Sequence, residues 1–378
     1  MNDALTRELD LIPRRAWVLS AIAGGFCALG IFFSRAQFFQ SWFFAWLFWL
    51  GVSLGALTIL MIQFLTGGAW GLAIRRLCEA AIAVVPLLAV LFLPVLFGTG
   101  DLFPWTHPTA AQARAWTHKQ IYLSTPFFTA RALLYFAIFI AFVAALRRWS
   151  IQHELGVVTA TQRLQRLSSG GLVAYALRIN FASTDWVLSL EPGWYSTMLA
   201  VVFMTSQLLS ALALMTALLG ALAHHEPLAS TLTAKHFHDL GNLLLAFVIF
   251  WAYVAFSQFL IIWSGNLPKE IGWYLHRRSG GWQWVALMLA AFQFFVPFAL
   301  LLSRATKRHK QRLAVIATLV FAASIVNVFW LVVPAFHPGS LRVHWLDAAA
   351  FLAVGSAWVA MFCSFLKKRS VLPPSAQD

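Results

Sequence analysis

The feature that most constrains this sequence is a series of long apolar runs that contain few charges. A helix needs about 20 mainly apolar residues to cross the hydrocarbon core of a bilayer. Soluble domains are about half apolar and a quarter charged, whereas this chain is 61% hydrophobic and 11% charged. We therefore predict ten membrane-spanning helices, at about residues 16–34, 41–64, 77–97, 126–146, 172–190, 195–222, 239–263, 282–302, 313–334 and 345–366.

Little sequence remains outside these runs, so the chain is predicted to form one all-α polytopic membrane domain over residues 16–366. Short cytoplasmic segments, 1–15 and 367–378, are expected to flank this domain. The first apolar run is too long for the core of a cleavable signal peptide, and we expect it to stay as a span. Residues 98–125 and 147–171 are predicted to form the two longer connections, on opposite sides of the membrane.

The distribution of Lys and Arg predicts how the spans are oriented. With ten spans both termini share one side, which holds 18 of the 27 basic residues, whereas the opposite side holds 7. Cytoplasmic loops of membrane proteins carry such an excess of Lys and Arg. The sequence therefore predicts an N-in, C-in arrangement. The same pattern explains the net charge of +14 without a nucleic-acid partner.

Residues that could hold a redox cofactor do not fall where one would be needed. All eleven histidines lie in predicted loops or near span ends, whereas a transmembrane b-type haem needs histidines deep in the bilayer. The three cysteines are scattered and have neither zinc nor iron–sulfur spacing. No phosphate loop, dinucleotide fingerprint or hydrolase motif is present. We predict no metal, no cofactor and no catalytic residue in this chain.

Charged residues inside the predicted spans mark the candidate sites. A charge at the bilayer centre costs about 2.5–3.5 kcal/mol on insertion scales, and such residues usually face the bundle interior. Asp185 and Arg131 lie at similar depth in two successive antiparallel spans, so we expect them to pair. Tyr135 extends the face that carries Arg131, and Arg178 lies seven residues before Asp185 on one helical face. Two interpretations stay open, a structural ion pair and a proton route.

A second polar series runs along the seventh predicted span. Asp239 and Asn242 follow Lys235 at helical spacing, and Tyr253 lies near the same face, so the series predicts a polar stripe across much of the bilayer. Glu79 lies at the cytoplasmic start of the third span. Glu79 and Asp239 are either interfacial acids paired with a nearby base or parts of the same proton route.

Gln207 in the sixth span and Asn327 in the ninth are interpreted as interhelical hydrogen-bonding residues. Such bonds are a common means of holding transmembrane helices together.

Four sequence blocks resemble a known family. They are "GGAWGLAIRRLCEA", "HKQIYLSTPFFTARALLYF", "STDWVLSLEPGWYSTM" and "DLGNLLLAFVIFWAYVAFSQFLIIWSGNLPKEIGWY". Together they resemble the F-type membrane subunit of bacterial alternative complex III, a quinol:electron-acceptor oxidoreductase. The resemblance runs from about Trp42 to Trp284. It implies the polysulfide-reductase-type superfamily of membrane anchors and a multi-pass protein of the bacterial inner membrane.

The resemblance also implies partners and site residues. A sibling polytopic membrane subunit, an iron–sulfur subunit and cytochrome c subunits are expected, and these last two would carry iron–sulfur clusters and haem c. The family's polar positions correspond here to Glu79, Arg131, Asp185 and Asp239. The sibling subunit is the better-supported quinol site of the family, and quinol binding by this chain stays open.

Three hypotheses follow. The chain is a non-haem membrane subunit of a quinol oxidoreductase with a part in proton movement or quinone access, a secondary transporter, or a structural anchor for a peripheral redox module. A transporter often carries Gly- or Pro-interrupted spans at matching positions of its two halves, and the sequence shows no obvious pair of them.

Overall fold

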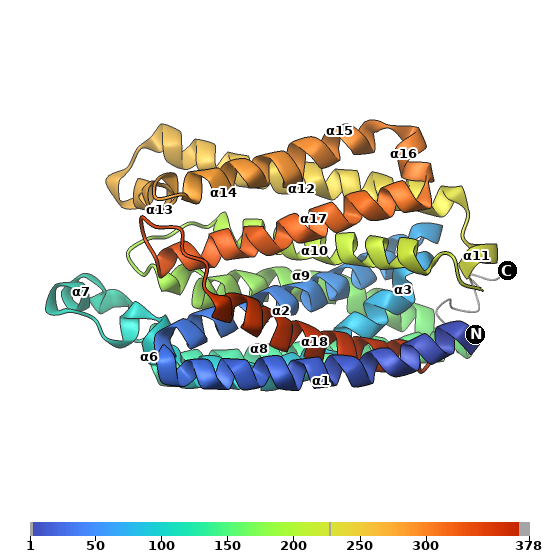
Figure 1. Ribbon diagram of the computed structural model, residues 1–378, viewed down its shortest axis with the longest axis horizontal. Coiled ribbons are helices and arrows are strands. Elements are labelled where there is room, and N and C mark those ends of the chain that lie inside the picture. The colour runs from blue at the N-terminus through green and yellow to red at the C-terminus, as the bar shows by residue number, and fades with distance from the viewer. Residues whose placement is uncertain (1–2, 227, 370–378) are drawn as a thin grey trace.

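The computed structural model describes residues 3–226 and 228–369, and these form a helical bundle without strands (Figure 1). The predicted all-α polytopic class is therefore confirmed. Nine helical stretches in the described residues are long and apolar enough to cross a membrane. They are Leu11–Phe33 of α1 (Asp3–Phe33), α2 (Arg35–Thr66), Ala69–Phe97 (α3 to α5), α8 (Thr125–Glu154), α10 (Leu199–Leu222), α12 (Ala234–Gly265), Trp282–Leu302 (α14 to α15), Lys310–Ala335 (α17 and η5) and α18 (Trp345–Leu366).

The tenth predicted span corresponds to α9, Val158–Trp186, which is 29 residues long. Its polar residues, Arg178, Asn180 and Asp185 among them, make it less apolar than the other nine. It nevertheless packs lengthwise in the bundle against α2, α8 and α10. Counting α9 gives an even number of crossings, and α1 begins at the same end of the bundle at which α18 ends (Figure 1). We call this the N/C end, and the other the opposite end.

α2 forms the centre of the bundle, and its residues from Phe38 to Met61 are almost all buried. A helix that is apolar on every side fits this position, because no face of it needs water. It packs against α1, α3, α9, α10, α17 and α18. Gly55 permits the close approach of α10, since a Cβ there would lie 2.1 Å from the backbone oxygen of Gln207.

The predicted cytoplasmic connection over residues 147–171 is wrong. α8 continues to Glu154 and α9 begins at Val158, so only residues 155–157 join them, with Gly156 at φ +77°. Arg, Gln, Leu and Ala are good helix formers, and both helices therefore extend past their most apolar segments. The long connection at the opposite end, 98–125, contains four short helical pieces. These are α6 (Thr99–Leu102), η1 (Pro104–Thr106), α7 (Ala110–Ala115) and η2 (Thr117–Lys119).

Two of the spans are interrupted, which the sequence did not predict. The third consists of α3 (Ala69–Ile82), α4 (Val85–Val90) and α5 (Leu93–Phe97), and a proline stands at the start of each of the last two. Proline lacks an N–H and clashes with the preceding turn, so it breaks a helix. The eighth consists of α14 (Trp282–Leu289), a π turn, η4 (Ala290–Phe295), and α15 (Val296–Leu302). Counted with α9, the ten spans form two successive sets of five, and each interrupted span is the third of its set.

The remaining helices are short and lie at the two ends of the bundle. α11 (Leu228–Thr231) and α16 (Arg304–Arg308) lie at the N/C end, and α13 (Pro268–Arg278) at the opposite end (Figure 1).

The orientation can be tested with fusions. Alkaline phosphatase fused after Lys368 is expected to be inactive, and green fluorescent protein fused there to be fluorescent, because the basic helix ends gather at the N/C end. The matched control is a fusion after Gln112 in α7, which should give the reverse pair of signals. Phosphatase activity after Lys368 would contradict the N-in, C-in arrangement.

Candidate functional site

A buried ion pair joins α8 to α9 near the opposite end of the bundle. Arg131 donates from Nε and from one terminal nitrogen to the two carboxylate oxygens of Asp185, at 2.8 Å each. The hydroxyl of Tyr135, one helical turn further along α8, donates to the same carboxylate at 2.8 Å. Asp185 is only 1% exposed. The predicted pairing of Arg131 with Asp185 is confirmed, and Tyr135 completes the cluster.

Aromatic rings shield this cluster from solvent. The Arg131 guanidinium lies 3.8 Å from the ring centroid of Tyr122 and 4.4 Å from that of Phe127. The ring of Trp186 stands edge-on to Tyr135 at 5.9 Å. A bidentate pair in such surroundings interacts more strongly than one in water, because the local dielectric is low. Losing either charge would leave the other one buried.

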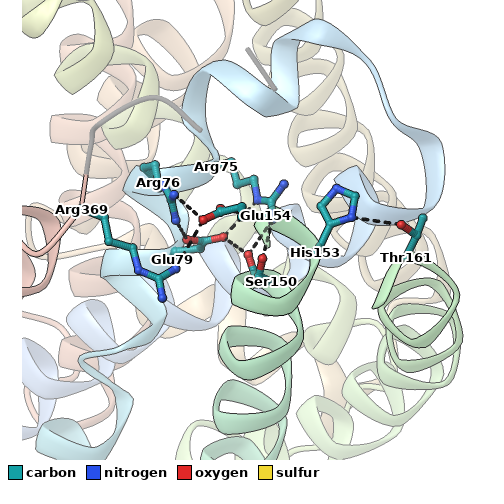
Figure 2. A network of polar contacts seen from close by, with 8 residues as sticks. All are labelled: Arg75, Arg76, Glu79, Ser150, His153, Glu154, Thr161 and Arg369. Atoms are coloured by element: carbon teal, nitrogen blue, oxygen red, sulfur yellow. Dashed lines mark hydrogen bonds and ion pairs between the residues drawn. The ribbon is translucent and has the colours of Figure 1, made fainter. Parts of the chain in front are cut away.

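A second cluster joins α3 to α8 at the N/C end (Figure 2). Glu79 accepts from Arg75 Nε at 3.0 Å, from Arg76 at 2.8 Å, and from the hydroxyl of Ser150. Arg75 donates to that hydroxyl at 2.6 Å, and Arg76 donates to Glu154 at 2.7 Å. The two acids of this cluster are thus held between two buried arginines.

Figure 2 shows a third arginine at the edge of this cluster, Arg369, whose guanidinium lies 3.7 Å from Glu154. With Arg75 and Arg76 the cluster carries three positive charges against the two carboxylates, Glu79 and Glu154.

Between the clusters lies a buried pair of neutral polar groups. The hydroxyl of Tyr175 on α9 donates to Oε1 of Gln207 on α10 at 2.5 Å. The Gln207 amide nitrogen has no partner among the described residues, and neither has the hydroxyl of Ser168, two turns earlier on α9. Gln207 thus forms the predicted interhelical bond, and so does Asn327, which donates to Ser206 at 2.9 Å.

These groups form a series along α8 and α9. Arg131 and Ser150 are 19 residues apart on α8, which at a rise of 1.5 Å per residue separates the two clusters by about 28 Å. On α9, Tyr175 lies about 10 Å from Ser168 and about 15 Å from Asp185 by the same rise. The intervals are longer than a hydrogen bond, so side-chain motion or water would have to connect them.

Four predicted residues lie outside both clusters. Arg178 is half-buried, and its guanidinium lies 5.4 Å from the ring centroid of Phe142. The polar stripe of α12 faces away from the bundle. Asp239 has a side chain 33% exposed, with His238 at 3.7 Å, and Tyr253 is 66% exposed.

The prediction of an interior stripe on α12 is therefore wrong. The α12 residues that pack inward are Phe237, Leu240, Gly241, Leu244, Val248 and Trp251, and Asp239, Asn242 and Tyr253 lie on the reverse side of that helix. Asn242 instead accepts a hydrogen bond from Lys307 of α16 at 2.6 Å, and this bond joins α16 to α12.

The histidines lie at helix ends or in connections, as predicted from the sequence. Across residues 3–226 and 228–369, no group of three or more His, Cys, Asp or Glu residues could hold a metal ion. The three cysteines are buried and free. That the chain carries no cofactor stays a prediction. Comparison with known proteins does not identify the family, because neither a protein-family model nor a curated protein matches the chain.

The sequence interpretation missed several members of the site. The expected alternative that Glu79 pairs with a nearby base is confirmed, but the bases, Arg75 and Arg76, were not identified as its partners, and Tyr175 was not singled out. A signal for the two arginines was present, because residues three and four apart share a helical face, and both arginines stand at that spacing from Glu79. No such signal marks Tyr175, since its partner is 32 residues away on another helix.

Proposed function

We propose that this chain is a non-haem membrane subunit of a bacterial respiratory quinol oxidoreductase and that its interior carries protons. The observation that supports a proton route best is the placement of buried carboxylates at both ends of α8, with Tyr175 and Gln207 between them. The resemblance of the four sequence blocks supports the choice of complex. Buried ionisable residues in a membrane protein are functional by default.

In this proposal the route begins at the cluster of Glu79, continues along α9 through Ser168 and Tyr175, and ends at Asp185. Hydroxyl and amide groups can both donate and accept, so they can pass a proton along hydrogen bonds. Arg131 donates two hydrogen bonds to the Asp185 carboxylate, so the two side chains form a bidentate ion pair. A proton arriving there would neutralise the acid and loosen the pair.

The electron-carrying groups belong to partner subunits in this proposal. Iron–sulfur clusters need cysteine thiolates, and a transmembrane haem needs histidines deep in the membrane. This chain offers three scattered cysteines and histidines at helix ends. The expected partners are an iron–sulfur subunit, cytochrome c subunits and a sibling polytopic membrane subunit, all held in the inner membrane.

Isolation from native membranes tests the choice of complex. A tagged copy of this chain should bring down subunits that contain haem c and iron–sulfur clusters, and the preparation should reduce an acceptor when quinol is added. The absorption spectrum, the iron content and the subunit masses provide the readouts. Isolation of this chain without any redox subunit would reject the proposal and leave the transporter.

The proton route has its own test in Tyr175→Phe, which removes one hydroxyl and keeps the ring. The complex is expected to assemble, while proton uptake during quinol oxidation in vesicles slows by about 100-fold, the lower end of the range for a proton-transfer group. The matched control is Tyr195→Phe, because Tyr195 is an exposed tyrosine outside the series. Equal proton uptake in the two variants would leave the chain as a structural anchor.

The interrupted third and eighth spans favour a second candidate, a secondary transporter. Transporters often bind their substrates where discontinuous helices from the two halves meet. Here α4, which follows the first break of the third span, packs on α2 and α8, whereas η4 packs on α12, α14, α15 and α17. The breaks are therefore built into different sides of the bundle, which favours the oxidoreductase subunit.

A further inference from the structure

A large cavity lies between α12, α13, α14 and α17, apart from the series of polar groups on α8 and α9. Its volume is about 1010 Å³, at the upper end of the range of about 300–1,000 Å³ for small-molecule sites. Aromatic and aliphatic side chains form most of the wall, among them Trp251, Phe259, Phe294 and Trp330. Exposed Tyr253, Phe256 and Trp263 stand at its rim, on the outer surface of α12.

Several polar groups on this wall have no hydrogen-bond partner among the described residues. Gln258 lines the cavity and is only 3% exposed, and no described residue bonds its amide. The indole Nε1 atoms of Trp251 and Trp330 are buried donors without an acceptor among residues 3–226 and 228–369. A buried polar group that lacks a partner costs about 1–3 kcal/mol. The wall therefore offers an unused amide and two unused donors to a ligand.

Of the two arginines that line the cavity, Arg278 is exposed at the surface, whereas Arg277 is buried and its guanidinium is already hydrogen-bonded within the protein. Arg277 of α13 donates to Glu191 at 3.1 Å and to the backbone oxygens of Trp273, Trp330 and Leu331. Burial lowers the pKa of its guanidinium to about 10, and Glu191 opposes the shift, so the group stays charged at neutral pH. With this pair internally neutralised, the interior of the cavity favours a neutral ligand.

The π turn of the eighth span forms one wall. Ala290, Phe294 and Phe295 belong to η4 and line the cavity. A π turn inside an α-helix is frequent at functional sites. The adjacent Gln293 is fully buried, and neither of its amide atoms has a partner in the described chain. The unusual backbone and the unused polar atoms thus occur together on the side of the bundle that holds the cavity.

We infer that this cavity binds a neutral, lipid-soluble ring compound that carries carbonyl or hydroxyl oxygens. The apolar wall accommodates a ring and a hydrocarbon tail. The Gln258 amide can donate to a carbonyl oxygen or accept from a hydroxyl, and the two indole N–H groups can only donate. The exposed aromatic rim opens toward the lipid side of α12, so a compound dissolved in the bilayer reaches the site without crossing water.

Quinones and quinols have this chemistry, and that identity rests on the proposed function. Among the described residues that line the cavity there is no carboxylate and no histidine. Oxidation of a quinol releases two protons and needs a base to accept them. The inference therefore assigns this cavity the binding or conduction of the compound.

Photolabelling tests this inference. The full chain is purified in lipid nanodiscs without quinone and illuminated with a decyl-benzoquinone that carries an azide. Saturable labelling is expected within Trp251–Trp263 or Trp282–Phe295, and an excess of unlabelled decyl-benzoquinone should abolish it. Labelling that is absent, that does not saturate or that phosphatidylglycerol displaces equally well would overturn the inference. Such a result leaves the proposed function untouched, because that depends on copurification and proton uptake.

Two conservative variants locate the binding groups. Gln258→Met keeps an unbranched side chain of similar length and removes the amide. Trp251→Phe removes an indole N–H that has no acceptor among the described residues. Each should weaken competition by unlabelled quinone about 5- to 10-fold, the effect of one lost hydrogen bond. The control is Gln120→Met, in the connection at the opposite end. Unchanged competition in both cavity variants would also overturn the inference.

Discussion

Replacing Asp185 by asparagine is expected to destabilise the assembled protein by about 3–5 kcal/mol, because it leaves the Arg131 guanidinium buried without its counter-charge. Arg131→Gln should cost a similar amount, since it leaves the carboxylate with Tyr135 alone. The double variant removes both charges, and we expect it to be more stable than either single variant. This non-additivity is the sign of a direct pair.

The measurement is the midpoint of thermal aggregation of the detergent-solubilised protein, together with the amount recovered from membranes. Arg178→Gln is the matched control, because Arg178 is an arginine inside a span that makes no ion pair in the described chain. Its midpoint should stay close to that of the parent protein. Additive losses in the double variant would contradict the pairing argument, whatever the role of the pair in proton transfer.

The second large effect is expected from Glu79→Gln. Glu79 accepts from both Arg75 and Arg76, so its neutralisation leaves two buried guanidinium groups to share Glu154. We expect a loss of about 3–5 kcal/mol, comparable to that for Asp185. Ser150→Ala removes one neutral hydrogen-bonding partner of the same carboxylate and should cost only about 1–3 kcal/mol.

Asp239→Asn is the control for this second experiment. Asp239 resembles Glu79 in the sequence, since each is an acid at the start of a span beside basic residues. In the structure its side chain is one-third exposed, and Nδ1 of His238 lies 3.7 Å from its carboxylate. Its neutralisation should change the midpoint little. A loss as large as that of Glu79→Gln would show that the charge of Asp239 stabilises the protein as much as that of Glu79.

Stability and proton transfer can be separated within these variants. Where an acid variant remains assembled, its rate of quinol oxidation and its proton uptake in vesicles are measured on the assembled fraction alone. A pair that only holds α8 and α9 together predicts normal coupling in that fraction. A proton route predicts slowed or uncoupled turnover for Asp185→Asn and Glu79→Gln.

The sequence by itself determined the class of the protein, the spans and one ion pair. Length and hydropathy identify nine of the ten predicted spans within the described residues, because a helix satisfies its own backbone and can cross a bilayer once it is apolar over a length set by the bilayer thickness. Depth was enough to pair Arg131 with Asp185, since two successive antiparallel spans place charges at matching levels. Both inferences depend on depth along the membrane normal, and within a helical span this depth follows from the residue number.

Only the tertiary structure decided which way each helix face points. Asp239 and Tyr253 have the spacing of an interior stripe, yet α12 presents Leu244 and Trp251 to the bundle and turns the polar residues outward. In a membrane apolar residues fit lipid and protein alike, so hydropathy does not determine the rotation of a helix about its axis. The contact of Tyr175 with Gln207 and the cavity beside Gln258 depend on the same rotation and on which helices become neighbours.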